Sequence, residues 1–431
     1  MASRLSIQHR LPLEVIEHII DQFADYNVDP DGRAHIDAES LKACSLTCQA
    51  FLPRARKHIF HSFVLIHDVD VYLFANFIHD FPELAHYVRF LYYVFEPSHT
   101  GNPLIPAAFQ RLTKLTSINL VAGSKTWHDV PRALRTPLLN LIRFPSIRYL
   151  RLEDIYNIAP YELFPCPNLK ELELSDVLLR RPGKPAVLEV QDCKPAQLER
   201  LQIEGRGSQF VLDMLNTRDA QGNPVLDLEQ VTDYTVYRIT NPTDFYATEE
   251  VMMQMPNLEK LHIACSHESS AAELVEKYSL AYINLKTLQL GFDLLGDDTL
   301  SSVCTLLRSI KGRNPIQSLQ LDILDSYHYI PNHKFKFALD KKLSEIEEIF
   351  LQPSWDSITN LTLEIIIPEG VEDGLTSWFN HKDQLPLSFK QDLEDKIKDS
   401  LNQCFKKLSE KKPFKFDYVI EDLQDYEDSE I

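Results

Sequence analysis

The sequence predicts an α/β protein in which a small N-terminal helical module is joined to an irregular solenoid of parallel strands with outer helices. Three observations predict this fold. About sixty N-terminal residues show helical spacing of apolar side chains, one six-residue apolar pattern then recurs ten times, and the stretches between its copies again show helical spacing. We expect a helical module at 1–66, a solenoid at 67–385, and a capping helix and strand with an acidic tail at 386–431.

The helical module is expected to contain three short helices followed by a strand at 63–66. Pro12 suits the first turn of a helix, where its missing N–H costs nothing, and the apolar residues of 15–23 share one helical face. The second and third helices are expected at 38–51 and 53–60. A domain of this size is marginal on its own, so a partner or a neighbouring domain should cover part of its apolar surface.

This segment resembles an F-box. The resemblance rests on LPLEVI at 11–16 and on LKACSLTCQAFLPRAR at 41–56, the second in the form common in fungal F-box proteins. In that family the Leu-Pro opening and the following helix face dock onto the Skp-type adaptor of a cullin–RING ubiquitin ligase. The loop at 25–37 is longer than the family's usual connection between its first two helices. The resemblance implies an adaptor-binding surface made by Leu11, Pro12, Val15, Ile16 and Ile19.

The sequence of the module allows two other interpretations. It resembles an ordinary helical cap of a repeat protein, and Cys44, Cys48, His58 and His61 together have the composition of a zinc site. Both cysteines lie on the predicted apolar helix face, where unligated cysteine is common. We therefore predict no metal and no other cofactor.

The rest of the chain repeats the pattern apolar-x-x-apolar-x-apolar. Eight clear copies start at Leu115, Ile147, Leu169, Leu198, Leu258, Leu285, Ile316 and Ile358, and two weaker ones at Val88 and Val231. Start-to-start spacings range from 22 to 42 residues, and most lie near the 20–29 residues of leucine-rich repeats. One such strand cannot bury its alternate residues alone, whereas stacked parallel strands share a continuous core.

The repeats are degenerate, because the asparagine or cysteine typical of the ninth position is missing. We expect an irregular curve; the alternative is an α/β domain without a true repeat. Helical spacing between the copies is clearest at 270–278 and at 300–310, and Gly312 follows as a C-cap. A helix of about five turns from residue 388, followed by a strand at 414–420, is expected to cap the solenoid, and the acidic residues 421–431 to form a solvated tail.

Composition excludes several classes of function. The formal net charge of −19 disfavours binding to nucleic acid or to an anionic membrane surface. The seven cysteines are widely spaced and odd in number, which favours a reducing compartment over a disulfide framework. The chain contains neither a recognisable signal peptide nor an apolar stretch of about 20 residues, so a cytoplasmic or nuclear location is expected.

The sequence contains no convincing catalytic motif, and we predict a non-enzymatic protein. An active site assembled from distant residues is the remaining enzyme hypothesis. Function is instead expected on the concave face, where acidic residues outnumber basic ones and favour a partner with a basic patch; a merely solvated sheet face is the alternative. The predicted residues of that face are Tyr149, Arg151, Glu153, Glu171, Glu173, Arg200, Gln202, Glu204, Asp233, Tyr237, Lys260, His262 and Gln289.

Resemblance to F-box proteins with leucine-rich repeats implies a substrate-recognition adaptor of an SCF-type cullin–RING ubiquitin ligase. The F-box would bind the Skp-type adaptor and through it the cullin scaffold, while the repeats would hold a protein substrate. The chain would then contribute proximity and orientation, not covalent chemistry. The alternative is a non-degradative interaction scaffold that uses the same helices.

Overall fold

The computed structural model divides the chain into two compact units. Unit 1 comprises the described residues up to Gln197 together with Asp213–Asp227, and unit 2 comprises Leu198–Leu212 and the described residues from Leu228 onward. The domain boundaries expected near 66 and 385 stay predictions. The structure describes residues 12–24, 37–47, 49–179, 194–239, 242–265, 284–293, 303–305, 307–308, 315–324, 343–367, 395, 398–399, 401–411 and 415–422.

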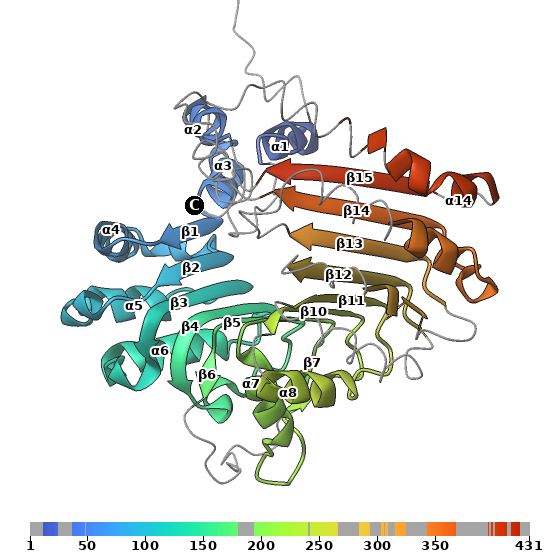
Figure 1. Ribbon diagram of the computed structural model, residues 1–431. Helices are drawn as coiled ribbons and strands as arrows, with labels where there is room; N and C mark the ends of the chain where they lie inside the picture. Colours follow the sequence, from blue (N-terminus) through green and yellow to red (C-terminus); the bar gives the residue numbers. More distant parts are fainter. Residues whose placement is uncertain are drawn as a thin grey trace, which may run out of the picture. The chain divides into compact units, whose positions relative to one another are not determined.

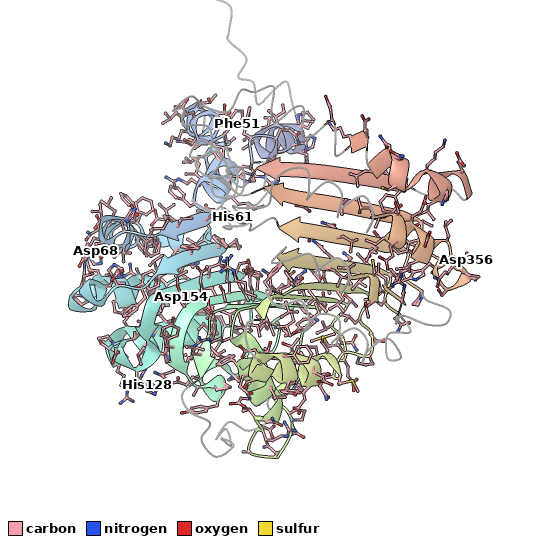
Figure 2. All side chains as sticks on the ribbon, viewed as in Figure 1. Phe51, His61, Asp68, His128, Asp154 and Asp356 are labelled. Carbon is pink, nitrogen blue, oxygen red and sulfur yellow. The ribbon has the colours of Figure 1, made fainter. Side chains whose placement is uncertain are left out.

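Unit 1 begins with the three predicted helices, α1 (Leu13–Asp21), α2 (Ala38–Thr47) and α3 (Leu52–Ile59). The second helix ends at Thr47, four residues earlier than predicted. Phe51 precedes α3 (Figure 2), and the proline at position 53 lies in its first turn, where no helical N–H bond is lost. Leu11 and the loop at 25–36 lie outside the described residues. The core of the module consists of Ile16, Ile20 and Leu41, with Phe23, Cys44, Phe51 and Ile59 packed against them.

The strands of unit 1 form a parallel sheet in the order β1-β2-β3-β4-β5 (Figure 1). Every neighbouring pair in this series is parallel. The strands are β1 (Ser62–Leu65), β2 (Phe90–Val94), β3 (Ser117–Thr126), β4 (Tyr149–Ile158) and β5 (Glu171–Ser175). Three short strands complete the unit: β6 (Leu178–Leu179) pairs with β4, and β7 (Ala196–Gln197) pairs with β9 (Leu226–Asp227).

Helices α4 (Asp68–Asp80), α5 (Leu104–Gln110) and α6 (Arg132–Ile142) follow β1, β2 and β3. Aromatic contacts join the first two of these helices to the sheet. Phe63 of β1 meets Phe74 of α4 with ring centroids 4.9 Å apart, and Tyr93 of β2 meets Phe109 of α5 at 5.0 Å. Alternate strand residues therefore point toward the helices, as the repeat pattern predicts.

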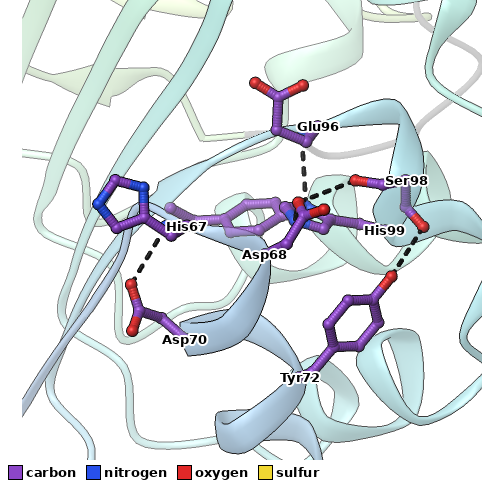
Figure 3. Close-up of polar contacts among 8 residues, drawn as sticks. His67, Asp68, Asp70, Tyr72, Glu96, Ser98 and His99 are labelled. Carbon is purple, nitrogen blue, oxygen red and sulfur yellow. Dashed lines mark hydrogen bonds and ion pairs between the residues drawn. The ribbon is translucent and has the colours of Figure 1, made fainter.

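A polar network around the buried His99 ties the turn after β2 to the start of α4 (Figure 3). Nδ1 of His99 accepts hydrogen bonds from the Tyr93 hydroxyl (2.9 Å) and from the Glu96 backbone N–H (3.2 Å). A backbone N–H can only donate, so the ring proton is on Nε2, which lies 2.9 Å from Oδ1 of Asp68. Ser98 donates to the same carboxylate oxygen at 2.9 Å. The network thus holds the Pro97–Gly101 turn against the helix N-terminus.

Unit 2 contains a parallel sheet in the order β8-β10-β11-β12-β13-β14-β15. The in-register row Leu201, Tyr234, Leu261, Leu288, Leu319 and Leu361 is the fourth position of six successive repeat copies, and each of these side chains is 1% exposed or less. The strands are β8 (Arg200–Glu204), β10 (Asp233–Ile239), β11 (Lys260–Cys265), β12 (Thr287–Asp293), β13 (Ser318–Leu324), β14 (Asn360–Ile367) and β15 (Lys415–Asp422).

All ten predicted copies of the pattern therefore form parallel strands. Each strand starts at the third residue of its copy. The first apolar residue of the copy lies just before the strand and is buried; Leu258 and Leu285, for example, are 1% and 3% exposed. The alternative of an α/β domain without a repeat does not fit this one-to-one register. A glycine turn follows β8, where Gly205 has a φ of +64°, a conformation that glycine adopts without strain.

The helices of unit 2 include α7 (Gly207–Asn216), which extends into unit 1, and α8 (Pro242–Met252). A buried hydrogen bond of 2.7 Å between Ser208 and Thr248 joins these two helices. Residues 343–350 are also helical. Of the predicted helix at 300–310, the described residues 303–305 and 307–308 are helical, whereas Gly312 and the segment 270–278 lie outside the described residues.

The predicted C-terminal helix is interrupted. Residues 401–404 are helical, a turn follows at Phe405, and α14 (Lys406–Lys411) then starts anew. The buried carboxylate of Glu347 accepts the Leu408 N–H at 2.9 Å, which satisfies a backbone donor at this second helix start. The predicted strand is confirmed as β15, which pairs in parallel with β14. It includes Glu421 and Asp422, so the prediction of a solvated tail starting at 421 is wrong for these two residues, because both pair with β14; residues 423–431 lie outside the described residues.

Candidate protein-binding surfaces

Each sheet has one face covered by helices and a second face, here called the strand face, on which the polar residues of the strands lie. The structure places all thirteen residues predicted for the concave face on these strand faces, each partly or fully exposed. Their role in binding stays a prediction. Unit 1 contributes Tyr149, Arg151, Glu153, Glu171 and Glu173, and unit 2 contributes Arg200, Gln202, Glu204, Asp233, Tyr237, Lys260, His262 and Gln289.

The strand face of unit 1 contains a compact ionic cluster on β4 and β5. The Arg151 guanidinium lies 3.0 Å from Glu153 and 3.2 Å from Glu173, and the Tyr149 hydroxyl donates to Glu173 at 2.6 Å. Burial, reinforced by Glu173, raises the pKa of Tyr149, so its hydroxyl remains a donor. Burial alone would lower the pKa of Arg151, but Glu173 and Glu153 outweigh it and raise the pKa. Glu173 is therefore engaged within the protein.

Sequence reasoning missed Tyr92 and Asn119, which lie beside this cluster on β2 and β3. Tyr92, Asn119, Arg151 and Glu173 form one in-register row across β2 to β5. Asn119 is 1% exposed, and its Oδ1 has no hydrogen-bond partner among the residues that the structure describes. All four residues occupy the fifth position of their repeat copies, so the repeat register could have identified them.

The first part of the strand face of unit 2 contains acidic side chains paired with basic ones. The Asp233 carboxylate lies between Arg200 (3.7 Å) and Lys260 (3.9 Å), which are 55% and 63% exposed. Glu204 pairs with Arg238 at 2.9 Å, on the bulge where Arg238 has a φ of +53°. Ion pairs this exposed contribute little to stability.

Farther along the strand face, amide side chains donate hydrogen bonds to carboxylates. Oδ2 of Asp322 accepts from Gln289 at 2.7 Å and lies 3.5 Å from Nε2 of His262. Gln320 donates both to Asp322 (3.0 Å) and to Glu364 (2.9 Å). Asp322, Gln320 and Glu364 were not among the predicted residues; Gln320 lies within its repeat copy, and the other two directly follow theirs.

Gly291 explains how His262 on β11 reaches Asp322 on β13. The intervening strand β12 carries no side chain at this position, and a Cβ there would lie 2.9 Å from the Ala264 Cβ. The His262 ring also packs edge-on against Tyr237, with centroids 4.7 Å apart. The small residues Ala264 and Gly291 therefore lie between the Tyr237–His262 aromatic pair and Asp322.

The helical module exposes apolar side chains on α1. Leu13, Val15 and Ile19 are 51%, 41% and 46% exposed. Ile16, predicted for the adaptor interface, is instead only 4% exposed, because the helical period places it with Ile20 on the core face. Pro12 is exposed, whereas Leu11 lies outside the described residues.

A polar network joins α1 to α3 within the module. Arg54 donates to both carboxylate oxygens of Asp21, and His58 Nε2 lies 2.7 Å from Oδ1 of Asp21. The hydrogen bonds from Arg54 hold the pKa of Asp21 at about 2, despite opposition from burial. Burial lowers the pKa of His58, so a neutral His58 donates its Nε2–H to the carboxylate.

The stability of the module is expected to fall as the pH drops from about 4 to about 2. A carboxyl with a lowered folded-state pKa stabilises the fold above its unfolded pKa of about 3.9, and this contribution is lost as the pH falls through the folded value near 2. Hydrogen exchange of α1 and α3 in the full chain should accelerate in this window relative to Asp21→Asn at the same pH. An equal pH response in both proteins would contradict the role of Asp21.

The enzyme and zinc hypotheses gain no site among the described residues. No group of three or more His, Cys, Asp or Glu side chains there could hold a metal; Cys48 lies outside them, and His58 is engaged by Asp21. The Tyr93–His99–Asp68 series has the order of a proton relay, but Tyr93 is fully buried and burial raises its pKa. It therefore offers a substrate no nucleophile.

The strands, register and helix-covered face together define an α/β protein of the leucine-rich-repeat type with parallel strands. No described helix is both long and apolar enough to cross a membrane. Neither a protein-family model nor a curated protein matches the chain. Among solved structures, it is similar to an internalin from Listeria monocytogenes at 15% identity and a TM-score of 0.25, covering 83% of this chain and 94% of that one. The repeat assignment rests on the strands of this chain alone.

Proposed function

We propose that this protein is the substrate-recognition subunit of an SCF-type cullin–RING ubiquitin ligase. The helical module docks the Skp-type adaptor, which connects it to the cullin scaffold, and the strand faces hold a target protein. The observation that carries the proposal is the apolar surface of α1, where Leu13, Val15 and Ile19 stay exposed outside the module core. Because solvated apolar side chains gathered on one short helix favour a protein partner, this surface supports docking.

The adaptor-binding set is refined accordingly. Pro12, Val15 and Ile19 are exposed and available for direct contact, and Leu13 joins them. Ile16 acts indirectly by packing on Ile20 and holding α1 in place. Leu11 remains in the set on the strength of the F-box resemblance.

The test is co-elution of the full chain with a recombinant Skp-type adaptor. Val15→Asp/Ile19→Asp is expected to abolish co-elution, since each buried apolar side chain contributes about 1.5–3 kcal/mol and each carboxylate would be desolvated. The matched control is Val69→Asp/Leu73→Asp on α4, which are 64% and 63% exposed and should bind like wild type.

Circular dichroism should show unchanged helicity in both double variants, because none of the four side chains lies in a core. Equal binding by wild type and Val15→Asp/Ile19→Asp would remove α1 from the interface. Absence of binding by wild type would withdraw the ubiquitin-ligase role.

The alternative is a non-degradative scaffold that uses the same module. The exposed surface of α1 supports adaptor docking equally well under this alternative. Co-purification of a cullin with the chain and its adaptor favours the ligase, and adaptor binding without cullin favours the scaffold. In either role the chain provides proximity and orientation, and a separate enzyme performs any covalent step.

A further inference from the structure

The edge of unit 1 at which the strands begin is rich in basic side chains. The turns that lead into β2, β3, β4 and β5 are residues 81–89, 111–116, 143–148 and 164–170. These turns contain one acid, Glu83, although acids outnumber bases by 63 to 44 in the whole chain. Five of their Arg and Lys residues, here called the basic edge, are Arg89, Arg111, Lys114, Arg143 and Arg148.

Backbone hydrogen bonds place members of the basic edge on neighbouring turns. The Thr116 N–H donates to the Arg89 carbonyl, and the Arg148 N–H donates to the Thr116 carbonyl, each at 2.8 Å. Because neighbouring strands are about 4.8 Å apart, the backbones of Arg89 and Arg148 are about 10 Å apart. Lys114 precedes Thr116 by two residues and so belongs to the turn between these two arginines.

Three of the arginines are held by backbone carbonyls, which carry no net charge. Nη1 of Arg89 donates to two carbonyls at 2.7 and 3.0 Å. Nη1 of Arg111 donates to the Ile78 carbonyl at 2.7 Å. Arg143 donates twice to the Glu162 carbonyl, at 3.1 and 2.6 Å. A guanidinium has five N–H donors, so each arginine is oriented and still has donors for a further acceptor.

The charge of the basic edge is not balanced by acids of the protein. Within the part of the chain that the structure describes, no carboxylate forms an ion pair with any of the five bases. The Glu162 carboxylate accepts the Ala159 N–H at 3.3 Å, while Arg143 is held by the Glu162 backbone. The side chains of Arg111, Lys114 and Arg148 are exposed. The edge is therefore a positive surface on an acidic protein.

A short acidic segment of protein fits this edge better than a long polyanion does. Charges interact over about 8 Å at physiological ionic strength, so a ligand confined to the edge is attracted mainly by its bases. A nucleic acid or an anionic membrane extends over the surrounding surface as well, where the net charge of −19 repels it. Carboxylates also match the planar guanidinium group bidentately.

We propose that the basic edge of unit 1 binds a short acidic segment of a partner protein, whose carboxylates contact Arg89, Lys114 and Arg148 in turn. An extended chain rises about 3.3 Å per residue, so three residues span the separation of about 10 Å between the two arginines. This inference goes beyond the proposed function, because the basic edge belongs neither to α1 nor to a strand face.

The probes are rhodamine-labelled peptides of equal length with alternating Glu-Ala, Gln-Ala or Lys-Ala residues, measured by fluorescence anisotropy with the full chain. Wild type is expected to bind the Glu-Ala peptide most tightly, whereas an acidic chain without this site would prefer the Lys-Ala peptide. Lys114→Gln/Arg148→Gln should weaken binding of the Glu-Ala peptide about tenfold, through the loss of two exposed charge contacts. Lys114→Arg/Arg148→Lys keeps both charges and should bind like wild type.

The matched control is Lys42→Gln/Arg132→Gln, which makes the same change of charge at two exposed positions outside the edge. Arg132 lies at the other end of α6 from Arg143, about 15 Å away along the helix axis. The control should keep the wild-type affinity for the Glu-Ala peptide, and all three double variants should keep the wild-type melting temperature. An equal loss of affinity in the control would assign the binding to overall charge and overturn the proposal.

Two further results would overturn the proposal. One is the absence of Glu-Ala binding by wild type. The other is tighter binding of a short oligouridylate, or of vesicles containing phosphatidylserine, which would reassign the edge to a nucleic acid or a membrane. Lys114→Gln/Arg148→Gln should co-elute with the Skp-type adaptor as wild type does. Failure of wild type to co-elute would count against the proposed function alone, and failure of the peptide pattern against this inference alone.

Discussion

Leu288→Ala is expected to destabilise unit 2 by about 2–5 kcal/mol, the range for truncation of a buried leucine that leaves a cavity. Leu288 is fully buried in the middle of the sheet and pairs with Leu261 on one side and Leu319 on the other. A gap here removes contacts from both neighbouring repeats, because each repeat is stabilised mainly by those beside it. The melting temperature should fall by about 5–15 °C for a unit of this size.

The control for this prediction is the next residue along the strand. Gln289 lies on the opposite face of β12, and Gln289→Ala should change the melting temperature only slightly. Thermal melts of the two variants thus test the strand register directly, since a shift by one residue would exchange the two faces. Equal destabilisation by both substitutions would contradict the register.

Phe109→Ala is expected to destabilise unit 1 by about 3–5 kcal/mol. The Phe109 side chain is fully buried, and its ring meets Tyr93 at 5.0 Å and Phe74 at 6.3 Å. Its removal would therefore weaken the contacts of α5 with both the sheet and α4. Hydrogen exchange should accelerate in α4, α5 and β2.

Hydrogen exchange also tests the division into two units. Faster exchange confined to unit 1 in Phe109→Ala, and to unit 2 in Leu288→Ala, is expected if each unit has its own core. The matched control for Phe109 is Phe81→Ala, because Phe81 is 50% exposed and should tolerate truncation. Uniform acceleration over the whole chain in either variant would show that the two units unfold together.

The repeats were predictable from sequence because their signal is local and recurrent. Leu285, Leu288 and Leu290 fix one strand, and nine similar copies fix the parallel order. The interruption of the C-terminal helix at Phe405 was not predictable, because it depends on Glu347, which is far away in sequence and caps the second helical segment. Local spacing contains no information about such a contact.

The candidate surfaces were only partly predictable for the same reason. Alternation along a strand correctly separated Arg151 and Gln289 from the buried positions. It did not indicate that Glu173 would be held by Tyr149 and Arg151, or that His262 would reach Asp322 across a glycine. In α1, the resemblance to the F-box predicted one adaptor-binding set. The helix geometry shows that Ile16 of this set is buried, whereas Val15 and Ile19 are exposed.

In the in-register rows of unit 2, equivalent side chains of successive repeats are one strand apart, about 4.8 Å. Each repeat contributes one fifth-position side chain to the strand face, while its buried fourth and sixth positions keep the strand in place. A single substitution at a fifth position therefore changes the surface locally, at that position and at the side chains it contacts, as Gln320 contacts Asp322 and Glu364. New specificity could be acquired one repeat at a time, without any change to the core that supports it.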